Sequence, residues 1–431
     1  MMRDVRNGVL YFDGCNTVEL AEKYGTPLYV YSENAILKEC NAIKECFLNK
    51  YENTRAAYAT KAFSSVMMCK LMDREGFCMD VVSGGELYTA IKAGFPAEKI
   101  EFNGNNKQRA EIELAVEYGI GRIIIDGMQE LALIEEVCKE KGKVMNVLYR
   151  LNPGVDSHTH AYITTGNLDS KFGLLQSEDV LYPAIESAIK SPYVNFKGVH
   201  FHVGSQLDDN RSHIMALESV LKIVKEVRTR FGYDIEELNV GGGFGVTYTT
   251  EERKPYAYFI QPMMDMIIDF CNKEGMERPA VVIEPGRSLI AEAAINLYTV
   301  GNIKEIPNVR KYVSVDGGMT DNIRPALYDA KYAGVIANKM DEPADDTITV
   351  CGKCCESGDI LITDGKFATP KTGDLLAIFT TGAYGYSMAS NYNKNPIPAV
   401  IMVKDGKSTE MIKRQSYEEM IARELHDPQW V

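Results

Sequence analysis

Eight short apolar segments, separated by segments with helical spacing of apolar residues, dominate the first two thirds of the 431-residue chain. Most of the apolar segments are rich in β-branched residues and lack polar/apolar alternation, as expected for strands buried on both faces. Eight strands alternating with helices over about 250 residues are typical of a (β/α)8 (TIM) barrel, and a doubly wound open sheet is the alternative that the pattern leaves open. The apolar segments cover residues 56–60, 77–82, 100–103, 122–126, 144–151, 196–203, 238–241 and 280–284, and the helical segments cover 84–93, 107–118, 129–140, 179–190, 211–230 and 256–273.

The last third of the chain has a different pattern of apolar and loop-forming residues. Short strand-like segments alternate with Gly-, Pro- and Asp-rich connections, and helical spacing is weak until residues 416–425. The strand-like segment 27–31 has no following helix of its own, so we expect it to join this second domain. The sequence therefore predicts a barrel domain over residues 35–286 and a mostly β domain made of 1–34 and 287–431. The expected strands of the last third are 294–300, 311–315, 347–351, 375–380 and 399–404.

Composition narrows the class of protein. The formal net charge is −13, which argues against a nucleic-acid or anionic-membrane partner. The chain has no apolar run of about 18 residues and no apolar N-terminal leader, so we expect a cytoplasmic protein with reduced cysteines. No metal site is predicted, because neither Cys351/Cys354 nor His158/His160 has the further ligands that zinc requires.

Polar side chains close most of the predicted strands. Chemistry in a (β/α)8 barrel takes place at the carboxyl ends of its strands, so these side chains should converge on one rim. They are Lys61, Asp80, Arg150, the segment from His202 to Ser205, the glycine run 241–245, and the segment 284–287, which begins with Glu284 and ends with Arg287.

Three of these features suggest a pyridoxal phosphate site. Lys61 is compatible with two roles, a desolvated nucleophile that forms a Schiff base and a lysine with its ammonium group in solvent. The glycine run fits either a phosphate cradle or a tight turn. Glu284 offers the acidic partner that the pyridine nitrogen of this cofactor needs. His202 could stack on the ring or be a hydrogen-bonded core residue.

The chain resembles the fold-type III pyridoxal-phosphate decarboxylases, and among them the diaminopimelate decarboxylase family. Each motif alone is weak to moderate, but their joint order and spacing are specific, and they extend over nearly the whole chain. The motifs lie at residues 58–62, 80–86, 170–173, 200–206, 241–245, 284–287, 324–328, 355–359 and 382–393.

The resemblance implies a role for each matching residue. Lys61 would carry the cofactor, Glu284 would pair with the pyridine nitrogen and His202 would stack on the ring. Cys355 would be the catalytic proton donor, entering from the neighbouring subunit of a homodimer. The remaining cofactor contacts would come from Asp80, Ser205, Gly243, Pro285, Gly286, Arg287 and Tyr384, and the substrate contacts from Arg287, Arg324, Tyr328, Glu356 and Tyr384.

The implied substrate is meso-2,6-diaminopimelate, which would be decarboxylated to L-lysine in lysine biosynthesis. Its remote end carries a carboxylate, suited to the guanidinium groups of Arg287 and Arg324, and an ammonium group, suited to Glu356. Ornithine lacks the remote carboxylate and would leave both arginines unpaired. The alternatives are a decarboxylase acting on ornithine, arginine or a polyamine precursor, an amino-acid racemase, which would place an arginine where this chain has Glu284, and a non-catalytic homologue.

Overall fold

The computed structural model describes residues 2–154 and 170–425 of the chain. The chain divides into two compact units. One, the barrel unit, comprises residues 39–246 and 252–288, and the other, the β unit, comprises residues 1–38, 247–251 and 289–431. The sequence-based division places the same two transitions at 34/35 and 286/287, and it assigns residues 247–251 to the barrel domain.

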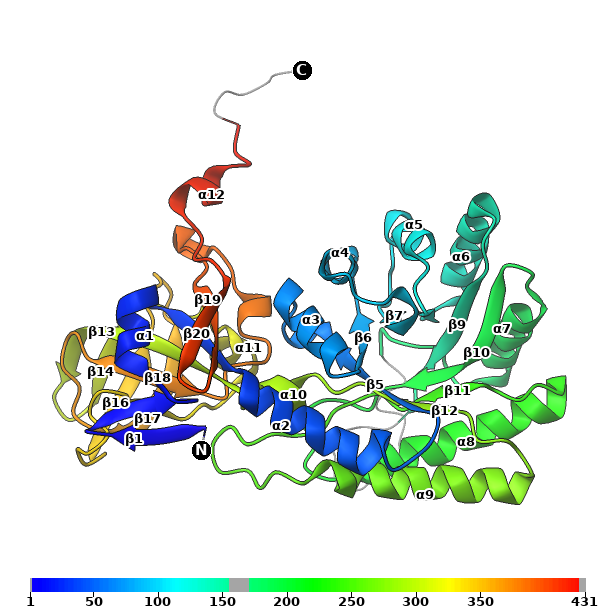
Figure 1. Ribbon diagram of the computed structural model, residues 1–431, viewed down its shortest axis with the longest axis horizontal. Coiled ribbons are helices and arrows are strands. Elements are labelled where there is room, and N and C mark those ends of the chain that lie inside the picture. Colours follow the sequence, from blue (N-terminus) through cyan, green and yellow to red (C-terminus); the bar gives the residue numbers. More distant parts are fainter. Residues whose placement is uncertain (1, 155–169, 426–431) are drawn as a thin grey trace. The chain divides into compact units, whose positions relative to one another are not determined.

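The barrel unit contains a closed sheet of eight parallel strands (Figure 1). Around the barrel the order is β10-β11-β12-β5-β6-β7-β8-β9, so the first strand of the unit pairs with the last. Closure confirms the predicted barrel and excludes the open sheet. The strands are β5 (Thr54–Ala59), β6 (Cys78–Val81), β7 (Ile100–Phe102), β8 (Arg122–Ile125), β9 (Met145–Leu151), β10 (Val194–Phe201), β11 (Glu237–Asn239) and β12 (Ala280–Ile283).

Helices alternate with these strands. The sequence sets their ends locally: Ser83 accepts a hydrogen bond from the Glu86 N–H at the start of α4, which ends at Gly94 with φ of 73°. The helix α3 was not predicted, because its apolar residues Val-Met-Met-Cys begin without polar spacing. The helices are α2 (Glu33–Ile43), α3 (Val66–Arg74), α4 (Gly84–Ala93), α5 (Arg109–Tyr118), α6 (Met128–Lys141), α7 (Glu178–Lys190), α8 (Arg211–Phe231) and α9 (Tyr256–Glu274).

The β unit is built on a nine-stranded sheet with the path β17-β16-β14-β13-β4-β19-β20, and β18 pairs with β13 and β15. The N-terminal strand β4 (Leu28–Ser32) lies between β13 and β19, which confirms that the start of the chain joins the β domain. The other strands of the sheet are β13 (Ala294–Ile306), β14 (Arg310–Val315), β15 (Gly334–Ile336), β16 (Asp346–Cys351), β17 (Ile360–Phe367), β18 (Leu375–Phe379), β19 (Ala399–Lys404) and β20 (Lys407–Ile412).

Smaller elements complete the fold. The strands β1 (Arg3–Arg6), β2 (Val9–Phe12) and β3 (Cys15–Asn16) form a separate sheet, and α1 (Thr17–Tyr24), α10 (Arg287–Ile290) and α11 (Arg324–Tyr328) are short helices. The helix predicted over 416–425 is wrong in length, because α12 (Tyr417–Ile421) ends four residues earlier and buries none of its side chains. Within the described ranges, no helix is long and apolar enough to cross a membrane.

Candidate active site

Lys61 lies in a short 3-10 turn (Thr60–Ala62) that follows β5 at the carboxyl end of the barrel. The turn is held on both sides of the lysine. The Thr60 hydroxyl lies 2.8 Å from the Asp80 carbonyl oxygen and 2.6 Å from Oε2 of Glu86, and the Tyr58 hydroxyl donates to the Phe63 carbonyl at 2.8 Å. The Lys61 side chain itself is exposed. A fixed backbone therefore presents a solvent-accessible amine at the barrel rim.

Glu284 follows β12 and is only 9% exposed. Its carboxylate receives three N–H groups, from β10, from β11 and from the residue that follows β7. His200 Nε2 lies 3.1 Å from Oε2, and Oε1 accepts from the side-chain amides of Asn103 at 3.0 Å and Asn239 at 2.9 Å. Burial raises the pKa of Glu284, but several neighbouring groups, first the charge and the hydrogen bond of His200, together hold this pKa below its usual range. Glu284 is therefore a buried anion.

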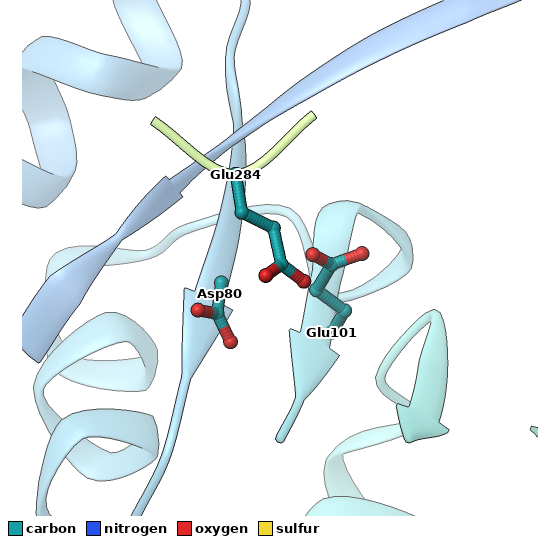
Figure 2. A group of neighbouring side chains, drawn as sticks. All are labelled: Asp80, Glu101 and Glu284. Carbon is teal, nitrogen blue, oxygen red and sulfur yellow. The ribbon is translucent and has the colours of Figure 1, made fainter. Parts of the chain in front are cut away.

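Two further carboxyl groups, from Asp80 and Glu101, face Glu284 (Figure 2). One carboxylate oxygen from each of the three lies within 4.8 Å of the others. Two like charges at about 4 Å repel by about 4 kcal/mol at an effective dielectric constant of about 20. Burial, and next the charge of Glu284, raise the pKa of both Asp80 and Glu101 well above the usual range. The cluster thus holds its negative charge on Glu284.

This carboxyl cluster has the residue types of a metal site, but each of its three carboxyl groups already accepts a hydrogen bond from an amide N–H group. Asn103 Nδ2 donates to Asp80 Oδ1 at 2.8 Å as well as to Glu284, and Asn239 Nδ2 donates to Glu101 Oε1 at 3.2 Å as well as to Glu284. The N–H groups of these amides carry partial positive charge toward the cluster, so they stabilise its carboxyl groups by hydrogen bonds and would repel a cation placed between them. We therefore interpret the cluster as a hydrogen-bonded network.

His202 lies just beyond β10, with its ring partly exposed at the rim. Its Nδ1 accepts the Gly242 N–H at 3.3 Å, which fixes the orientation of the ring. Burial, and next the positive charge of Lys61, lower the pKa of His202 well below its ordinary value. A neutral, flat imidazole is thus held at the rim that carries Lys61.

The glycine run 241–245 packs closely against the loop that follows His202. The Leu207 N–H donates to the Gly243 carbonyl at 2.9 Å, and the Gly245 N–H donates to the Leu207 carbonyl at 3.1 Å. Gly243 has a φ of 104°, and a Cβ there would lie 2.6 Å from the Gly204 carbonyl oxygen. The tight turn therefore accounts for these glycines by packing alone, and phosphate binding at Gly243 stays a prediction.

The segment after Glu284 contacts the residues that follow β10 on one side and the end of β5 on the other. The Arg287 guanidinium donates to Ser205 Oγ from Nε at 3.2 Å and from Nη2 at 3.0 Å. The Pro285 carbonyl accepts the Ala59 N–H at 3.1 Å, and a Cβ on Gly286 would lie 3.0 Å from that of Ala59. Pro285 and Gly286 thus support the strand end that carries Lys61, and Arg287 and Ser205 bring a guanidinium and a hydroxyl together, two groups that could bind an anion.

In the β unit, Arg324 is surrounded by tyrosines. Its Nε donates to the Tyr332 hydroxyl at 3.0 Å, and its guanidinium carbon lies 5.4 Å, 5.5 Å and 5.9 Å from the ring centres of Tyr328, Tyr384 and Tyr248. Tyr384 has a φ of 60°, an unfavourable backbone conformation for a residue with a bulky side chain. Such strain is frequent at ligand-binding positions. The tyrosines hold the planar guanidinium in one orientation.

Cys355 and Glu356 occupy an exposed loop of the β unit. The loop is shaped from below by Asp359, which is 2% exposed and accepts the N–H groups of Met319 at 2.6 Å and Cys354 at 2.8 Å. The Cys355 N–H donates to Asn393 Oδ1 at 2.7 Å. A buried carboxylate therefore organises a loop in which Cys355 and Glu356 are exposed.

Comparison with known proteins identifies the family. Residues 33–291 match the model of the pyridoxal-dependent decarboxylases, pyridoxal binding domain. The diaminopimelate decarboxylase of Bacillus subtilis (strain 168) is 47% identical over 424 residues, which are 98% of this chain and 97% of that protein. The chain belongs to the diaminopimelate decarboxylase family. A second relative of that name, from Staphylococcus aureus (strain COL), is 45% identical over 96% of this chain and 97% of its own length.

The fold agrees with a solved member of the diaminopimelate decarboxylase family. The structure of the Methanocaldococcus jannaschii enzyme in complex with L-lysine superposes with a TM-score of 0.93 at 37% identity, covering 99% of this chain and 98% of that chain. The likeness extends over the barrel and the β sheet alike. The architecture predicted from the sequence is therefore that of the family.

In this member of the diaminopimelate decarboxylase family, the predicted site residues fall into two groups. The barrel unit brings together Lys61, Asp80, His202, Ser205, Gly243, Glu284, Pro285, Gly286 and Arg287 around one rim. The β unit carries Cys355, Glu356, Arg324, Tyr328 and Tyr384. The Cys351 and Cys354 thiols are free, and the pair His158 and His160 lies outside the described residues.

Several residues of the site were not predicted. Glu101, Asn103 and Asn239 build the network around Glu284, and His200 had no role beyond its place in a motif. The available signal was a polar residue inside an apolar segment, as in Ile100-Glu101-Phe102. That signal does not tell whether the side chain points into the barrel or away from it, which depends on strand pairing.

Proposed function

We propose that this protein decarboxylates meso-2,6-diaminopimelate to L-lysine and carbon dioxide, with pyridoxal phosphate as the cofactor. The observation that carries the proposal is the 47% identity to a diaminopimelate decarboxylase over 98% of the chain. The M. jannaschii relative was solved with L-lysine, the product of this reaction. The barrel domain, 35–286, would bind the cofactor, and the β domain, 1–34 with 287–431, would complete the site.

The groups on the barrel rim suit pyridoxal phosphate by their chemistry. Bound there, the cofactor supplies an electron sink for the bond that breaks. Lys61 Nζ would hold it covalently, and His202 offers a flat neutral ring to stack on its face. Glu284 would hold a proton at the ring nitrogen, which requires the carboxylate to be ionised, as its three N–H donors favour.

The other end of the cofactor is a phosphate, which needs donors. Ser205 and Arg287 offer a hydroxyl and a guanidinium, Gly243 a backbone N–H and Tyr384 a phenol. We propose that these groups bind the phosphate, Arg287 also serving the substrate. Asp80 would assist from below as part of the carboxyl cluster.

Substrate recognition is proposed to rest on the β unit. Arg324, held by tyrosines, would bind the remote carboxylate as a planar fork, and Tyr328 and Tyr384 would line its path. Glu356 would receive the remote ammonium group. Positioning of the remote end would set the leaving carboxylate in the reactive orientation, so that binding energy contributes to the rate.

Cys355 is proposed to give its thiol proton to the carbon that has lost the carboxylate. A proton donor must be shielded from bulk water, yet the Cys355 side chain is exposed in the single chain. Its exposure supports a homodimer in which the Cys355 loop covers the barrel site of the partner, and Leu327 and Tyr328, 54% and 57% exposed, are further large side chains of the β unit that a partner could cover. The ten free thiols agree with a reducing, cytoplasmic location.

Product analysis tests the proposed reaction. Purified protein loaded with pyridoxal phosphate would be incubated separately with meso-diaminopimelate, ornithine and arginine, and the products separated by chromatography. We expect lysine from meso-diaminopimelate and no product from the other two. Putrescine or agmatine instead would overturn the substrate assignment, and a racemised amino acid would overturn the reaction.

A matched variant tests the part of Arg324. Arg324→Lys keeps the charge but loses the planar fork, so we expect KM for meso-diaminopimelate to rise by about 10- to 100-fold, as for loss of a charge-assisted hydrogen bond. Tyr312→Phe, which alters a tyrosine on strand β14, is the control and should behave as wild type. An unchanged KM in Arg324→Lys would remove Arg324 from the substrate site.

A further inference from the structure

The interior of the barrel carries a column of charged and amide side chains where apolar layers are usual. Beneath Glu284 lie Asp80 from β6 and Glu101 from β7 (Figure 2). Below Glu101, the Arg122 Nη1 lies 3.8 Å from Oε2 of Glu101, and the Arg122 Nε lies 3.4 Å from Oε1 of Glu237. Glu237 also pairs with Arg55. The column thus connects the proposed pyridine-nitrogen partner with an ion-pair network further down the barrel.

Glu101 is the member of this column with the least support as an anion. Its side chain is completely buried. Oε1 accepts a single amide N–H, from Asn239, which it shares with Glu284, and Oε2 has no hydrogen bond among the described residues. The nearest cation, Arg122, lies closer to Glu237 than to Glu101. A buried carboxylate with so few donors is costly.

Glu284 is supported in the opposite way. It accepts N–H groups from His200, Asn103 and Asn239. The charged and titratable groups that face Glu101 are Asp80 and Glu284 above it and Arg122 and Glu237 below it, from β6, β12, β8 and β11. Asp80, Glu101 and Glu284 place one carboxyl oxygen each within 4.8 Å of one another, so a proton on one of them relieves their mutual repulsion. Glu101 is suited to carry that proton, because its Oε2 accepts no hydrogen bond among the described residues.

We propose that Glu101 is a positioning residue for the decarboxylation: it is a neutral carboxylic acid that donates a hydrogen bond to the Glu284 carboxylate. The consequence is that the single negative charge of the cluster stays on the group that faces the cofactor ring nitrogen. The raised pKa of Glu101, caused first by burial and next by the charge of Glu284, agrees with this role. The inference rests on the proposed function, because only a pyridine nitrogen gives Glu284 this task.

The protonation of Glu101 can be tested without cofactor or substrate. Infrared spectroscopy of the cofactor-free protein in H2O and D2O detects carbonyl bands of buried protonated carboxyl groups. We expect Glu101→Gln to lose part of this absorbance at neutral pH. Glu237→Gln is the matched control, a buried glutamate of the same column that is paired with Arg55 and Arg122, and it should keep the full absorbance. An unchanged band in Glu101→Gln would overturn the proposal.

The effect on the reaction is tested by two substitutions of different character. Glu101→Gln keeps an N–H donor for Glu284 and an acceptor for Asn239, so kcat and its pH profile should stay within about twofold of wild type. Glu101→Leu removes the donor, and kcat should fall by about 10- to 100-fold with little change in KM, since Glu101 does not touch the substrate. Equal losses in both variants, or no loss in Glu101→Leu, would overturn the positioning role.

Failure of the proposed function would look different. If the wild-type protein forms no lysine from meso-diaminopimelate, the decarboxylation is wrong, whereas the infrared result still reports the proton on Glu101. Glu101→Leu is also assayed for cofactor binding by visible absorbance and for folding by thermal unfolding. If it does not fold, the infrared test and the rate of Glu101→Gln decide, and a Glu101→Gln rate reduced 10-fold or more would contradict the role.

Discussion

The barrel rim and the exposed loop of the β unit carry chemically active groups in opposite ways. Around Glu284, side chains from different sides of the barrel meet in the interior, and the amides of Asn103 and Asn239 each donate to two carboxyl groups of the cluster. Around Cys355, the buried Asp359 and the side chain of Asn393 shape a loop in which Cys355 is exposed. One region is complete within its unit, and the other presents an open face.

The difference teaches how the proposed reaction is divided. The part that tunes the cofactor needs a fixed, dry arrangement of charges, because electrostatic effects are strong only where water is excluded. The part that recognises the substrate and delivers a proton must let the substrate enter. An open face acquires a dry environment only when another surface covers it, as a partner subunit would. The following substitutions test this division.

Lys61→Ala should have the largest effect. The variant should fold but lose the visible absorbance of the lysine-bound cofactor, and kcat should fall on the order of 10⁴-fold or more, as for other covalent catalytic groups. Absorbance and steady-state rates measure this, with circular dichroism as the folding control. If the cofactor absorbance survives in Lys61→Ala, the barrel rim does not hold the cofactor as described.

Glu284→Gln should retain the cofactor and lose rate. The amide cannot carry the negative charge that holds a proton at the ring nitrogen, so kcat should fall by about 10²- to 10³-fold, the usual loss when one preorganised electrostatic partner is removed. A cofactor titration followed by visible absorbance should give an affinity close to wild type. A rate near wild type would show that the buried cluster does not tune the cofactor.

Cys355→Ala tests the exposed region alone. Because Cys355 lies in the β unit and not in the barrel network, the visible spectrum of the bound cofactor should be unchanged. Loss of a proton donor should lower kcat by about 10²-fold, the lower end of the range for general acid catalysis. Turnover equal to wild type would assign the protonation to another group. An altered spectrum would show that Cys355 also affects the cofactor environment, which the account assigns to the barrel alone.

The smallest effect concerns the pH dependence of stability in the β unit. Burial raises the pKa of Asp321 to about 7, although the Tyr298 hydroxyl and the Gly318 N–H donate to its carboxyl group. Because the folded state then binds more protons than the unfolded state between about pH 4 and pH 7, the free energy of unfolding should decrease as pH rises through that window, by a few kcal/mol at most.

Asp321→Asn removes this titration. Its free energy of unfolding, measured by urea denaturation at several pH values, should decrease less steeply between about pH 4 and pH 7 than that of wild type. The remaining slope would come from other buried acids, such as Asp80 and Glu101, whose pKa is raised as well. Parallel curves for the two proteins would mean that Asp321 is ionised throughout the window.

The sequence predicted the strands and helices of the barrel better than the side chains that meet inside it. Apolar segments that alternate with helices predict the barrel strands, and strand ends then predict that Lys61, His202 and Glu284 share a rim. Glu101 and Asn239 could not be assigned in this way, because their direction depends on the pairing of β7 and β11 with their neighbours. Strand β17 was missed because Asp364, Gly365 and Lys366 interrupt its apolar pattern. The strand forms nevertheless, because its backbone pairs with that of β16.

The two-region account is tested most directly by mixing inactive variants. Lys61→Ala and Cys355→Ala would be combined under conditions where subunits exchange, and decarboxylation of meso-diaminopimelate would be measured. If each site takes Lys61 from one chain and Cys355 from the other, every mixed dimer contains one intact site, and an equal mixture should recover about one quarter of wild-type activity. Proven exchange without any recovery would contradict the account and place both groups of each site in the same chain.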